Sequence, residues 1–176
     1  LIDTLRQAMG AAAVRTDEAA LEQHRHDYWM ISHLRDRFGG AAPAPTCVVR
    51  PRTVADVQAA VRIAAQARTP LIPFGLGSGV VGGVITSPEA MVLDMGALNQ
   101  VRSIDKVNLL ASFDAGMNGL LAEETVAAQG LTIGHWPQSV AVSSVGGWVA
   151  TRASGQFSTL YGNIEDILHS VEVVLP

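Results

Sequence analysis

The residues best suited to hold a ligand form a glycine-rich run, residues 73–83, in which five positions are glycine. Glycine adopts positive φ angles without strain, so consecutive backbone N–H groups in such a run can point inward and form an anion-binding nest. The missing Cβ also lets a phosphate approach the backbone closely. The run follows an apolar stretch, residues 71–74, that we expect to be a strand. Its chemistry is therefore anion binding, with phosphate as the first candidate.

The basic residues around this run narrow the kind of phosphate ligand. A Walker A loop ends in Gly-Lys-Ser or Gly-Lys-Thr, and the run has no such ending. No Lys or Arg stands between Arg68 and Arg102, so a phosphate must be held mainly by backbone N–H groups and by the Ser78 hydroxyl. This arrangement favours a bound diphosphate cofactor over a nucleoside triphosphate that undergoes phosphoryl transfer.

Two other interpretations of the run stay open. Residues 77–82 match the dinucleotide fingerprint G-x-G-x-x-G, and Asp94 lies further along the chain, as a ribose-binding acid would. That fingerprint requires a helix that begins at the loop, and residues 83–88 are too short and too broken to form one. The loop also follows the second expected strand rather than the first, which argues against an NAD-binding Rossmann domain. A glycine-rich turn that binds nothing is the other alternative.

A second group of small residues occupies residues 134–139 and 143–155. Gly146 and Gly147 can let a flat ring system lie against the backbone, and serine and threonine hydroxyls surround them. A flavin ring needs such a flat surface, with donors directed at its carbonyls and nitrogens. Taken alone, the cluster can also be an ordinary tight helix start. Together with the first loop, it favours a flavin.

The elements that position these two regions follow from periodicity and capping. Thr53 is a good N-cap, Asp56 follows three positions later, and apolar residues then recur at helical spacing until Pro70 ends the pattern. A strand on each side of this helix makes a β-α-β unit. We expect helices at residues 3–9, 18–38, 53–68, 119–129 and 145–153, and strands at residues 46–49, 71–74, 91–94, 100–104, 108–113 and 166–175.

This order of elements predicts an α+β fold with a small β-α-β lobe and a second α+β lobe. Residues 1–45 form an N-terminal helical extension and linker, and residues 46–176 form the ligand-binding domain. The chain has no initiator Met, and its last expected strand is followed by no helix or polar tail. We interpret these ends as those of a segment cut from a longer protein.

The composition excludes several classes of protein. Hydrophobic residues make up 48% and charged residues 16%, which is typical of a well-buried soluble domain and not of a disordered one. The net charge of −4 argues against a general nucleic-acid binder. No stretch is apolar and long enough to span a bilayer, and the first residues lack the pattern of a signal peptide, so we expect a cytoplasmic protein.

Several single residues have both a chemical and a structural interpretation. Cys47 stands in an apolar run and has no partner for a disulfide, so we expect a buried strand thiol rather than a nucleophile. His24, His26 and His33 lie in a charged segment without the cysteines or tight carboxylate pattern of a metal site. We therefore expect no metal, and a solvated helix surface there.

Three positions in the second half invite similar alternatives. His135 is a candidate for a cofactor contact and, less directly, for a catalytic base. The pair Glu165-Asp166 resembles an acid pair, but adjacent residues cannot face one point, so a turn or helix cap is the better interpretation. Tyr161 can either pack in the protein or form a hydrogen bond near a flavin.

Four ordered strings carry a resemblance to a known family. They are Pro73-Phe74-Gly75-Leu76-Gly77-Ser78-Gly79, Gly134-His135-x-Pro137-x-Ser139, Ser144-Val145-Gly146-Gly147-Trp148-Val149-Ala150-Thr151-Arg152-Ala153-Ser154-Gly155 and Tyr161-Gly162-Asn163-Ile164-Glu165-Asp166. From about Cys47 to Pro176 the chain resembles the FAD-linked oxidases, with an FAD domain of the vanillyl-alcohol oxidase or p-cresol methylhydroxylase (PCMH) type. The last two strings are most similar to alkyldihydroxyacetonephosphate synthase and its bacterial relatives.

The resemblance implies a two-lobed fold that clasps FAD. The first loop would cradle the FAD pyrophosphate through Pro73, Phe74, Gly75, Leu76, Gly77, Ser78 and Gly79. The second cluster would line the isoalloxazine and ribityl region through Gln138, Ser139, Val140, Ser143, Ser144, Gly146, Gly147, Thr151, Arg152, Ala153 and Ser154. Some family members attach FAD to a His in the first loop. No His or Cys stands between Phe74 and Gly83, so we expect non-covalent FAD.

The chain departs from the family pattern at two positions. The family often has Gly-Gly-Gly-Thr-Ser in the first loop, where this chain has Gly75-Leu76-Gly77-Ser78-Gly79, so the Leu76 side chain can reshape the nest. The synthases have Asp at the position of Gln138, which weakens a synthase assignment.

The resemblance further implies an FAD-dependent oxidoreductase in which FAD accepts a hydride from a small hydroxy acid or related alcohol. A synthase that uses FAD for redox-neutral ether formation is the close variant, and a truncated FAD-binding module without activity of its own is another. Substrate-binding and catalytic residues of the family lie mostly in a C-terminal cap domain, so no catalytic residue is assigned to this chain. The resemblance also leaves room for a homodimer.

Overall fold

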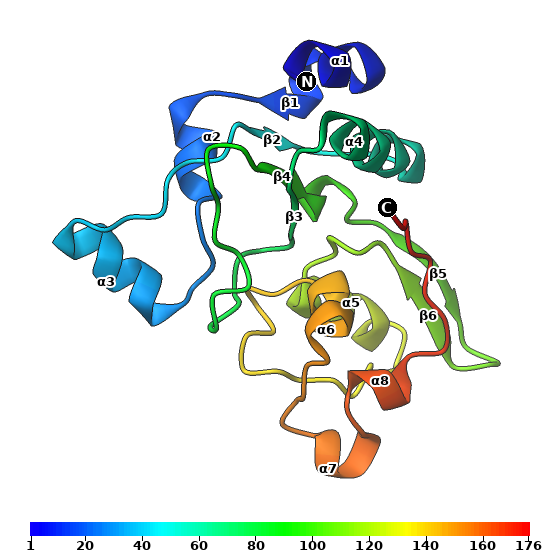
Figure 1. The fold of residues 1–176 in the computed structure, drawn as a ribbon. Coiled ribbons are helices and arrows are strands. Elements are labelled where there is room, and N and C mark those ends of the chain that lie inside the picture. The colour runs from blue at the N-terminus through cyan, green and yellow to red at the C-terminus, as the bar shows by residue number, and fades with distance from the viewer. The chain divides into compact units, whose positions relative to one another are not determined.

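The computed structural model describes all residues 1–176, and the chain divides into two compact units (Figure 1). Unit 1 consists of Leu1–Ala97 with the last residues Val173–Pro176, and unit 2 consists of Leu98–Glu172. Each unit contains both helices and strands, so the α+β prediction is confirmed.

Unit 1 is built on a four-stranded sheet in the order β1-β2-β4-β3. β1 is antiparallel to β2, whereas β2, β4 and β3 run parallel to one another. Val48 and Val92, at the centre of the sheet, are fully buried, as expected for a parallel sheet covered on both faces. The strands are β1 (Val14–Arg15), β2 (Cys47–Val49), β3 (Leu71–Phe74) and β4 (Met91–Asp94).

Helix α4 (Val54–Ala67) is the crossover between β2 and β3 and lies beside the sheet in Figure 1. Thr53 and Asp56 form a reciprocal capping box at its start, as their spacing predicts. Its buried residues Ala60 and Ala64 are small, which allows close packing on that side. The remaining helices of unit 1 are α1 (Ile2–Met9), which packs against α4, the short 3₁₀ turns η1 (Ala11–Ala13) and η2 (Met95–Ala97), α2 (Glu18–Gln23) and α3 (Met30–Phe38).

Unit 2 begins with the antiparallel hairpin of β5 (Val101–Asp105) and β6 (Leu110–Phe113). The Asp105 carboxylate closes the turn by accepting the N–H groups of Val107 and Asn108. Asn118 then caps α5 (Gly119–Ala127), and Ser144 caps α6 (Val145–Thr151). Two short helices follow, α7 (Ser158–Tyr161) and α8 (Ile164–Ile167).

Two expected elements are wrong. The helix expected over residues 18–38 is interrupted, because α2 ends at Gln23 and α3 begins only at Met30. The strand expected over residues 166–175 does not form: residues 164–167 are α8, and residues 168–176 are irregular. The Asn163–Asp166 capping box favours the helix, which confirms that Asp166 serves as a cap and not as half of an acid pair.

The expectation for Cys47 is confirmed. The side chain is fully buried in β2, and this burial raises the pKa of the thiol to about 11. The thiol is therefore protonated at neutral pH and is a poor nucleophile.

Candidate functional site

Three strand ends meet at one edge of the sheet of unit 1. Because β2, β3 and β4 are parallel, their carboxyl ends lie at the same edge, where ligands commonly bind in α/β sheets. Phe74 pairs in register with Asp94, and Arg50 directly follows Val49, the last residue of β2. The glycine loop therefore starts beside an arginine and an aspartate that are distant from it in sequence.

The loop leaves β3 with free backbone donors. The N–H groups of residues 76–83 donate no hydrogen bond to any acceptor in the chain. Gly77 has a φ of 74°, and a Cβ there would lie 2.8 Å from the Phe74 ring. The Leu76 side chain is partly exposed to solvent and is not packed in the core. The loop can thus present several donors to an anion, as the glycine pattern predicts.

The second half of the loop is packed against the segment between α2 and α3. A Cβ on Gly79 would lie 2.8 Å from an Asp27 carboxylate oxygen, and one on Gly82 would lie 2.8 Å from the Trp29 ring. The Asp27 carboxylate also accepts the N–H group of Val84 at 3.4 Å. Asp27 is buried and forms no ion pair, and its two carboxylate oxygens accept the N–H groups of Trp29 and Val84, so an acidic side chain already occupies the space beside residues 79–84.

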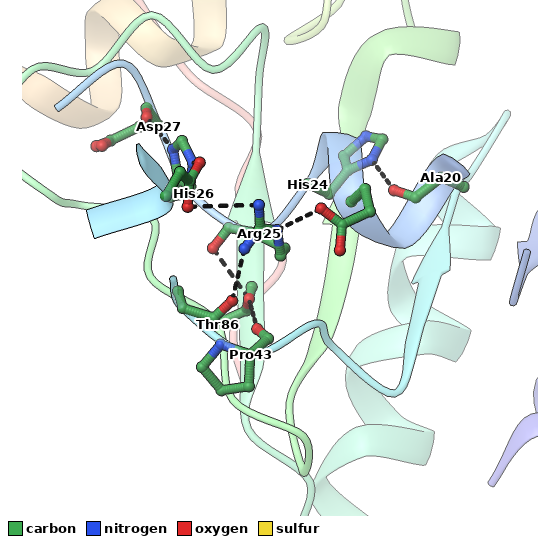
Figure 2. A network of polar contacts seen from close by, with 10 residues as sticks. Ala20, His24, Arg25, His26, Asp27, Pro43 and Thr86 are labelled. Atoms are coloured by element: carbon green, nitrogen blue, oxygen red, sulfur yellow. Dashed lines mark hydrogen bonds and ion pairs between the residues drawn. The ribbon is translucent and has the colours of Figure 1, made fainter. Parts of the chain in front are cut away.

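Further hydrogen bonds join the same two segments. Tyr28 donates its N–H to the Gly77 carbonyl at 2.9 Å, and Asp27 donates its N–H to Val84 at 3.1 Å. Figure 2 shows the other end of this contact, where the Thr86 hydroxyl reaches the carbonyls of Arg25 and Pro43 at 2.9 and 2.7 Å. The segment between α2 and α3 therefore contacts both ends of the glycine loop.

A pocket of about 370 Å³ opens beside the first half of the loop. Gly75, Leu76 and Gly77 form one side of it, and Arg50, Phe74 and Asp94 line it from the strand ends. The remaining wall comes from the end of α2, the segment between α2 and α3, and α3, and it includes Gln23, His24, His26, Asp27, Tyr28 and His33. Polar and charged side chains, among them one arginine and two aspartates, make up most of this lining, which suits a polar ligand.

The charges at the pocket centre on Asp94. Arg50 Nε lies 2.7 Å and His24 Nε2 lies 3.4 Å from the same carboxylate oxygen, Oδ2. Gly96 donates its N–H to the other oxygen, Oδ1, at 2.8 Å. Burial alone would raise the pKa of Asp94, but the hydrogen bonds from His24 and Gly96 and the charge of Arg50 outweigh it and lower the pKa. Asp94 is therefore a carboxylate at neutral pH.

The expected solvated surface is wrong for His24, whereas His33, in α3, is exposed as expected. His24 is buried, its ring packs against Phe74 with centroids 4.6 Å apart, and Nδ1 donates to the Ala20 carbonyl at 2.7 Å (Figure 2). His26 is also largely covered and contacts Asp36. Composition alone could not show this, because the break between α2 and α3 places His24 next to Phe74 and Asp94. No three His, Cys, Asp or Glu side chains are grouped as a metal site requires.

Sequence reasoning also missed Arg50, and it considered Asp94 only as the ribose-binding acid of a Rossmann domain. It searched for cations near the glycine loop in sequence, whereas Arg50 arrives from the strand two positions away in the sheet. The one sequence feature that could have identified Arg50 and Asp94 is that each stands at the carboxyl end of an expected parallel strand.

In unit 2, the second small-residue cluster surrounds the start of α6. A Cβ on Gly146 would lie 2.7 Å from both the Cβ and the carbonyl oxygen of Ala115, and a Cβ on Gly119 would collide with the Trp148 ring. The N–H groups of Gly146 and Gly147 are satisfied by the Ala115 carbonyl and the Ser144 hydroxyl. These glycines therefore permit close packing, and the start of α6 has few free donors.

Most hydroxyls of this cluster already donate within unit 2. Ser143 donates to the Ser139 carbonyl at 2.8 Å and accepts the indole N–H of Trp148 at 2.7 Å. Thr151 donates to the Gly147 carbonyl, and Ser154 donates to Asn163, each at 2.8 Å. Each of these hydroxyls can still accept a hydrogen bond from a ligand, but its own hydrogen is already donated within the chain.

The free donors of unit 2 lie instead in the turn before α6. The N–H groups of Gln138, Ser139 and Ala141 have no acceptor in the chain, although the N–H of Val140 bonds to Pro137. Ala153 donates its N–H to the Trp148 carbonyl, so it too is committed. Arg152 has a φ of 52° and pairs with Glu165 at 2.8 Å, with its side chain largely exposed.

His135 is the least satisfied buried group of unit 2. It is 1% exposed, and neither ring nitrogen has a hydrogen-bond partner. Its ring stands edge-on to Trp148 with centroids 4.8 Å apart. Burial lowers the pKa of His135, so the ring is neutral at pH 7 and offers one donor and one acceptor. An orphaned pair of buried polar atoms fits a site that is completed by a bound group.

The nearby aromatic Tyr161 has a packing role. It is about half exposed, and its ring covers Gly134, where a Cβ would lie 2.9 Å from the ring.

The class of protein follows from comparison with known sequences. Residues 45–176 match the family described as FAD binding domain. The chain therefore belongs to this FAD-binding family, which confirms the resemblance and FAD as the cofactor. Free donors in the first loop, free donors before α6 and the unpartnered His135 all fit such a group.

The particular relatives are flavoproteins of several kinds. The chain is 35% identical over 177 residues to the uncharacterized FAD-linked oxidoreductase YgcU of Escherichia coli (strain K12), covering 99% of this chain and 36% of that protein. It is 32% identical to alkyldihydroxyacetonephosphate synthase of Trypanosoma brucei brucei, covering 99% of this chain and 29% of that protein. It is 30% identical to glycolate oxidase subunit GlcD of Bacillus subtilis (strain 168), covering 74% and 28%. The chain spans about a third of the length of these relatives.

Solved structures support the fold. An alkyldihydroxyacetonephosphate synthase structure superposes with a TM-score of 0.87 at 30% identity, covering 94% of this chain and 30% of that one. A p-cresol methylhydroxylase structure superposes with a TM-score of 0.69 at 19% identity, covering 86% and 29%, and so shows the fold alone. The PCMH-type prediction is confirmed. None of the helices combines the length and apolar character needed to cross a membrane.

Proposed function

We propose that this chain holds FAD non-covalently, with the FAD diphosphate against the first half of the glycine loop. The observation that carries this proposal is the set of unpaired N–H groups from residue 76 onward, beside a pocket that Gly75 and Gly77 line. Residues 73–79 are the diphosphate cradle in this proposal. The absence of His and Cys from residues 75–83 supports a cofactor held without a covalent bond.

For unit 2, we propose that residues 138–144 and 151–154 line the isoalloxazine and ribityl parts of FAD. The unpaired N–H groups of Gln138 and Ser139 support this role, because flavin carbonyls and nitrogens accept such hydrogen bonds. His135 is a further contact in this proposal, since its buried ring nitrogens have no partner in the chain. Gly146 and Gly147 act through packing, by holding α6 close to Ala115 and Ser144.

We propose that the whole protein is an FAD-dependent oxidoreductase whose substrate is a hydroxy acid or a related alcohol. Bound FAD supplies a hydride acceptor for a substrate carbon. This chain contributes the cofactor site, and the residues that bind and activate the substrate lie outside it, in a C-terminal cap domain. The similarity to glycolate oxidase subunit GlcD supports this class of substrate.

A synthase-like activity is the second candidate. The identity to an alkyldihydroxyacetonephosphate synthase and the TM-score of 0.87 favour it. Gln138, where the synthases have Asp, counts against it. Anaerobic mixing of the FAD-loaded whole protein with 2-hydroxy acids separates the two. Net bleaching of the flavin spectrum supports the oxidoreductase, and a flavin that no hydroxy acid reduces contradicts it.

The cofactor site is tested first by titrating the purified chain with FAD and following flavin fluorescence. Leu76→Asp places a negative charge in the proposed diphosphate cradle, and Val81→Asp places the same charge on an exposed position in the second half of the loop. We expect Leu76→Asp to weaken FAD binding by about tenfold or more, because two like charges about 4 Å apart near a protein surface repel by about 4 kcal/mol, and about 1.4 kcal/mol already corresponds to tenfold. Equal effects of the two variants would contradict the placement of the diphosphate.

A further inference from the structure

One arginine stands at the mouth of the glycine loop, although the loop itself contains no cation. Arg50 and the residues Gly75, Leu76 and Gly77 line the same pocket. Residues 69–101 contain no Lys or Arg, so neither the loop nor β3 and β4 can supply a cation to a bound diphosphate. A cation can come only from a neighbouring element, and Arg50 reaches this edge from the end of β2.

The guanidinium of Arg50 is held in place and still has donors free. Its Nε atom contacts Asp94 Oδ2 at 2.7 Å, and Asp94 is itself anchored by the Gly96 N–H and by His24. The two terminal nitrogens of Arg50 form no hydrogen bond within the chain. Its side chain is 45% exposed, whereas that of Asp94 is 9% exposed. A buried carboxylate thus orients a half-exposed guanidinium, which has five N–H donors in a rigid planar arrangement.

The distribution of negative charge selects the half of the loop that an anion can use. Asp27 lies against Gly79 and Gly83 without a basic partner, so an anion there would meet a buried carboxylate at short range. Gly75, Leu76 and Gly77 share the pocket with Arg50, whose charge offsets that of Asp27, which also lines this pocket. The electrostatics therefore favour the first half of the loop.

We propose that Arg50, oriented by Asp94, pairs with the FAD diphosphate bound at residues 75–78. This inference rests on the proposed FAD site and adds to it a cation from another strand. Arginine is well suited to the role, because its planar donors match the oxygens of a phosphate group. Arg50 is then a cofactor-binding residue, and Asp94 is a positioning residue.

The test measures the binding of FAD, ADP and riboflavin to the unmodified chain and to two variants. Arg50→Ala removes the proposed contact. Arg52→Ala is the matched control, since Arg52 lies two positions away, is exposed and forms no ion pair. We expect Arg50→Ala to weaken FAD and ADP binding by about tenfold or more at low salt, as loss of a charge-assisted contact does. Riboflavin, which lacks the diphosphate, should bind both variants equally.

Three further measurements accompany this comparison. Arg50→Lys keeps the charge that Asp94 requires but loses the planar donors, so it should recover part of the ADP affinity. For the unmodified chain, ADP affinity should fall as salt rises, whereas riboflavin affinity should not. Circular dichroism verifies that each variant is folded.

The outcomes separate this inference from the proposed function. If the unmodified chain binds FAD and ADP but Arg50→Ala behaves like Arg52→Ala, the FAD site stands and the role of Arg50 is wrong. Equal weakening of riboflavin and ADP by Arg50→Ala would also overturn it, because the effect would then not concern the diphosphate. If the folded, unmodified chain binds neither FAD nor ADP, the proposed site and this inference both fail.

Discussion

The two glycine-rich regions are similar in composition but differ in what their backbone donors do. In the loop of unit 1, the N–H groups of residues 76–83 are free, and charged side chains line the adjacent pocket. At the start of α6 in unit 2, Gly146 and Gly147 have bonded N–H groups, and Gly146 faces Ala115 at close range. The comparison shows that glycine gives a ligand access to the backbone in the first region, and gives a helix close packing in the second.

The largest effect should come from the charged centre that only the first region possesses. Asp94→Asn should lower the free energy of unfolding at pH 7 by about 2–3 kcal/mol. This is below the range for a fully buried pair because Arg50 is half-exposed. Denaturant unfolding of the two proteins measures it. A change within about 0.5 kcal/mol, as for ordinary surface substitutions, would contradict this account of the strand-end cluster.

The same variant tests the lowered pKa of Asp94. A carboxyl whose pKa is lower in the folded state stabilises the fold fully above its unfolded pKa of about 3.9, and this contribution is lost as the pH falls through the folded pKa. Between pH 5 and pH 2, the unmodified chain should therefore lose more stability than Asp94→Asn. Parallel acid-unfolding curves would show that Asp94 does not contribute.

The packing role of glycine in unit 2 is tested by Gly146→Ala. The new Cβ would lie 2.7 Å from Ala115 Cβ and from its carbonyl oxygen, so the backbone must shift. We expect a loss of about 1–3 kcal/mol in unfolding free energy, as for other overpacked sites. Gly147→Ala is the control, because its Cβ would meet only the Ser144 hydroxyl, at 3.0 Å. If the two variants were equally stable, the close packing of Gly146 against Ala115 would not explain why a glycine stands there.

Asp27→Ala tests whether Asp27 keeps an anion away from the second half of the glycine loop. The substitution removes the acceptor of the Trp29 and Val84 N–H groups, so the chain should lose about 1–2 kcal/mol of stability. Because the negative charge beside Gly79 also disappears, the selectivity of the loop should relax, and Val81→Asp should weaken FAD binding more in this background than in the unmodified chain. An unchanged effect of Val81→Asp would show that Asp27 does not restrict the anion.

The smallest effect concerns His135 in unit 2. Burial lowers its pKa, so the folded state binds a proton less readily than the unfolded chain, and stability should fall as the pH drops below about 6.5. His135→Phe should remove part of this decline between pH 6.5 and pH 5. Bound FAD should also change the NMR shifts of the His135 ring protons if the ring contacts the cofactor, and unchanged shifts would contradict that contact.

Local patterns were reliable where a few neighbouring residues determine the structure. The Thr53–Asp56 capping box, the strand at residues 71–74 and the hairpin near Asp105 all depend on short-range hydrogen bonds and burial, and they form as expected. The interruption between α2 and α3 was missed, because contacts of Asp27 and Trp29 with a loop more than fifty residues away outweigh local helix propensity. The expected strand at residues 166–175 failed because it pairs with no other strand.

The sequence by itself determined the two candidate regions, the cofactor class and the likeness to an FAD-binding family, because glycine spacing and short motifs are properties of consecutive residues. Only the tertiary structure decided which charges stand beside the loop. Arg50, Asp94 and His24 come from β2, β4 and the end of α2, and parallel pairing of the strands brings them to one edge of the sheet. Only the fold could likewise distinguish the glycines whose N–H groups stay free from the glycines that pack against Ala115 and Trp148. The reason is that the role of a glycine depends on which atoms lie where its Cβ would be.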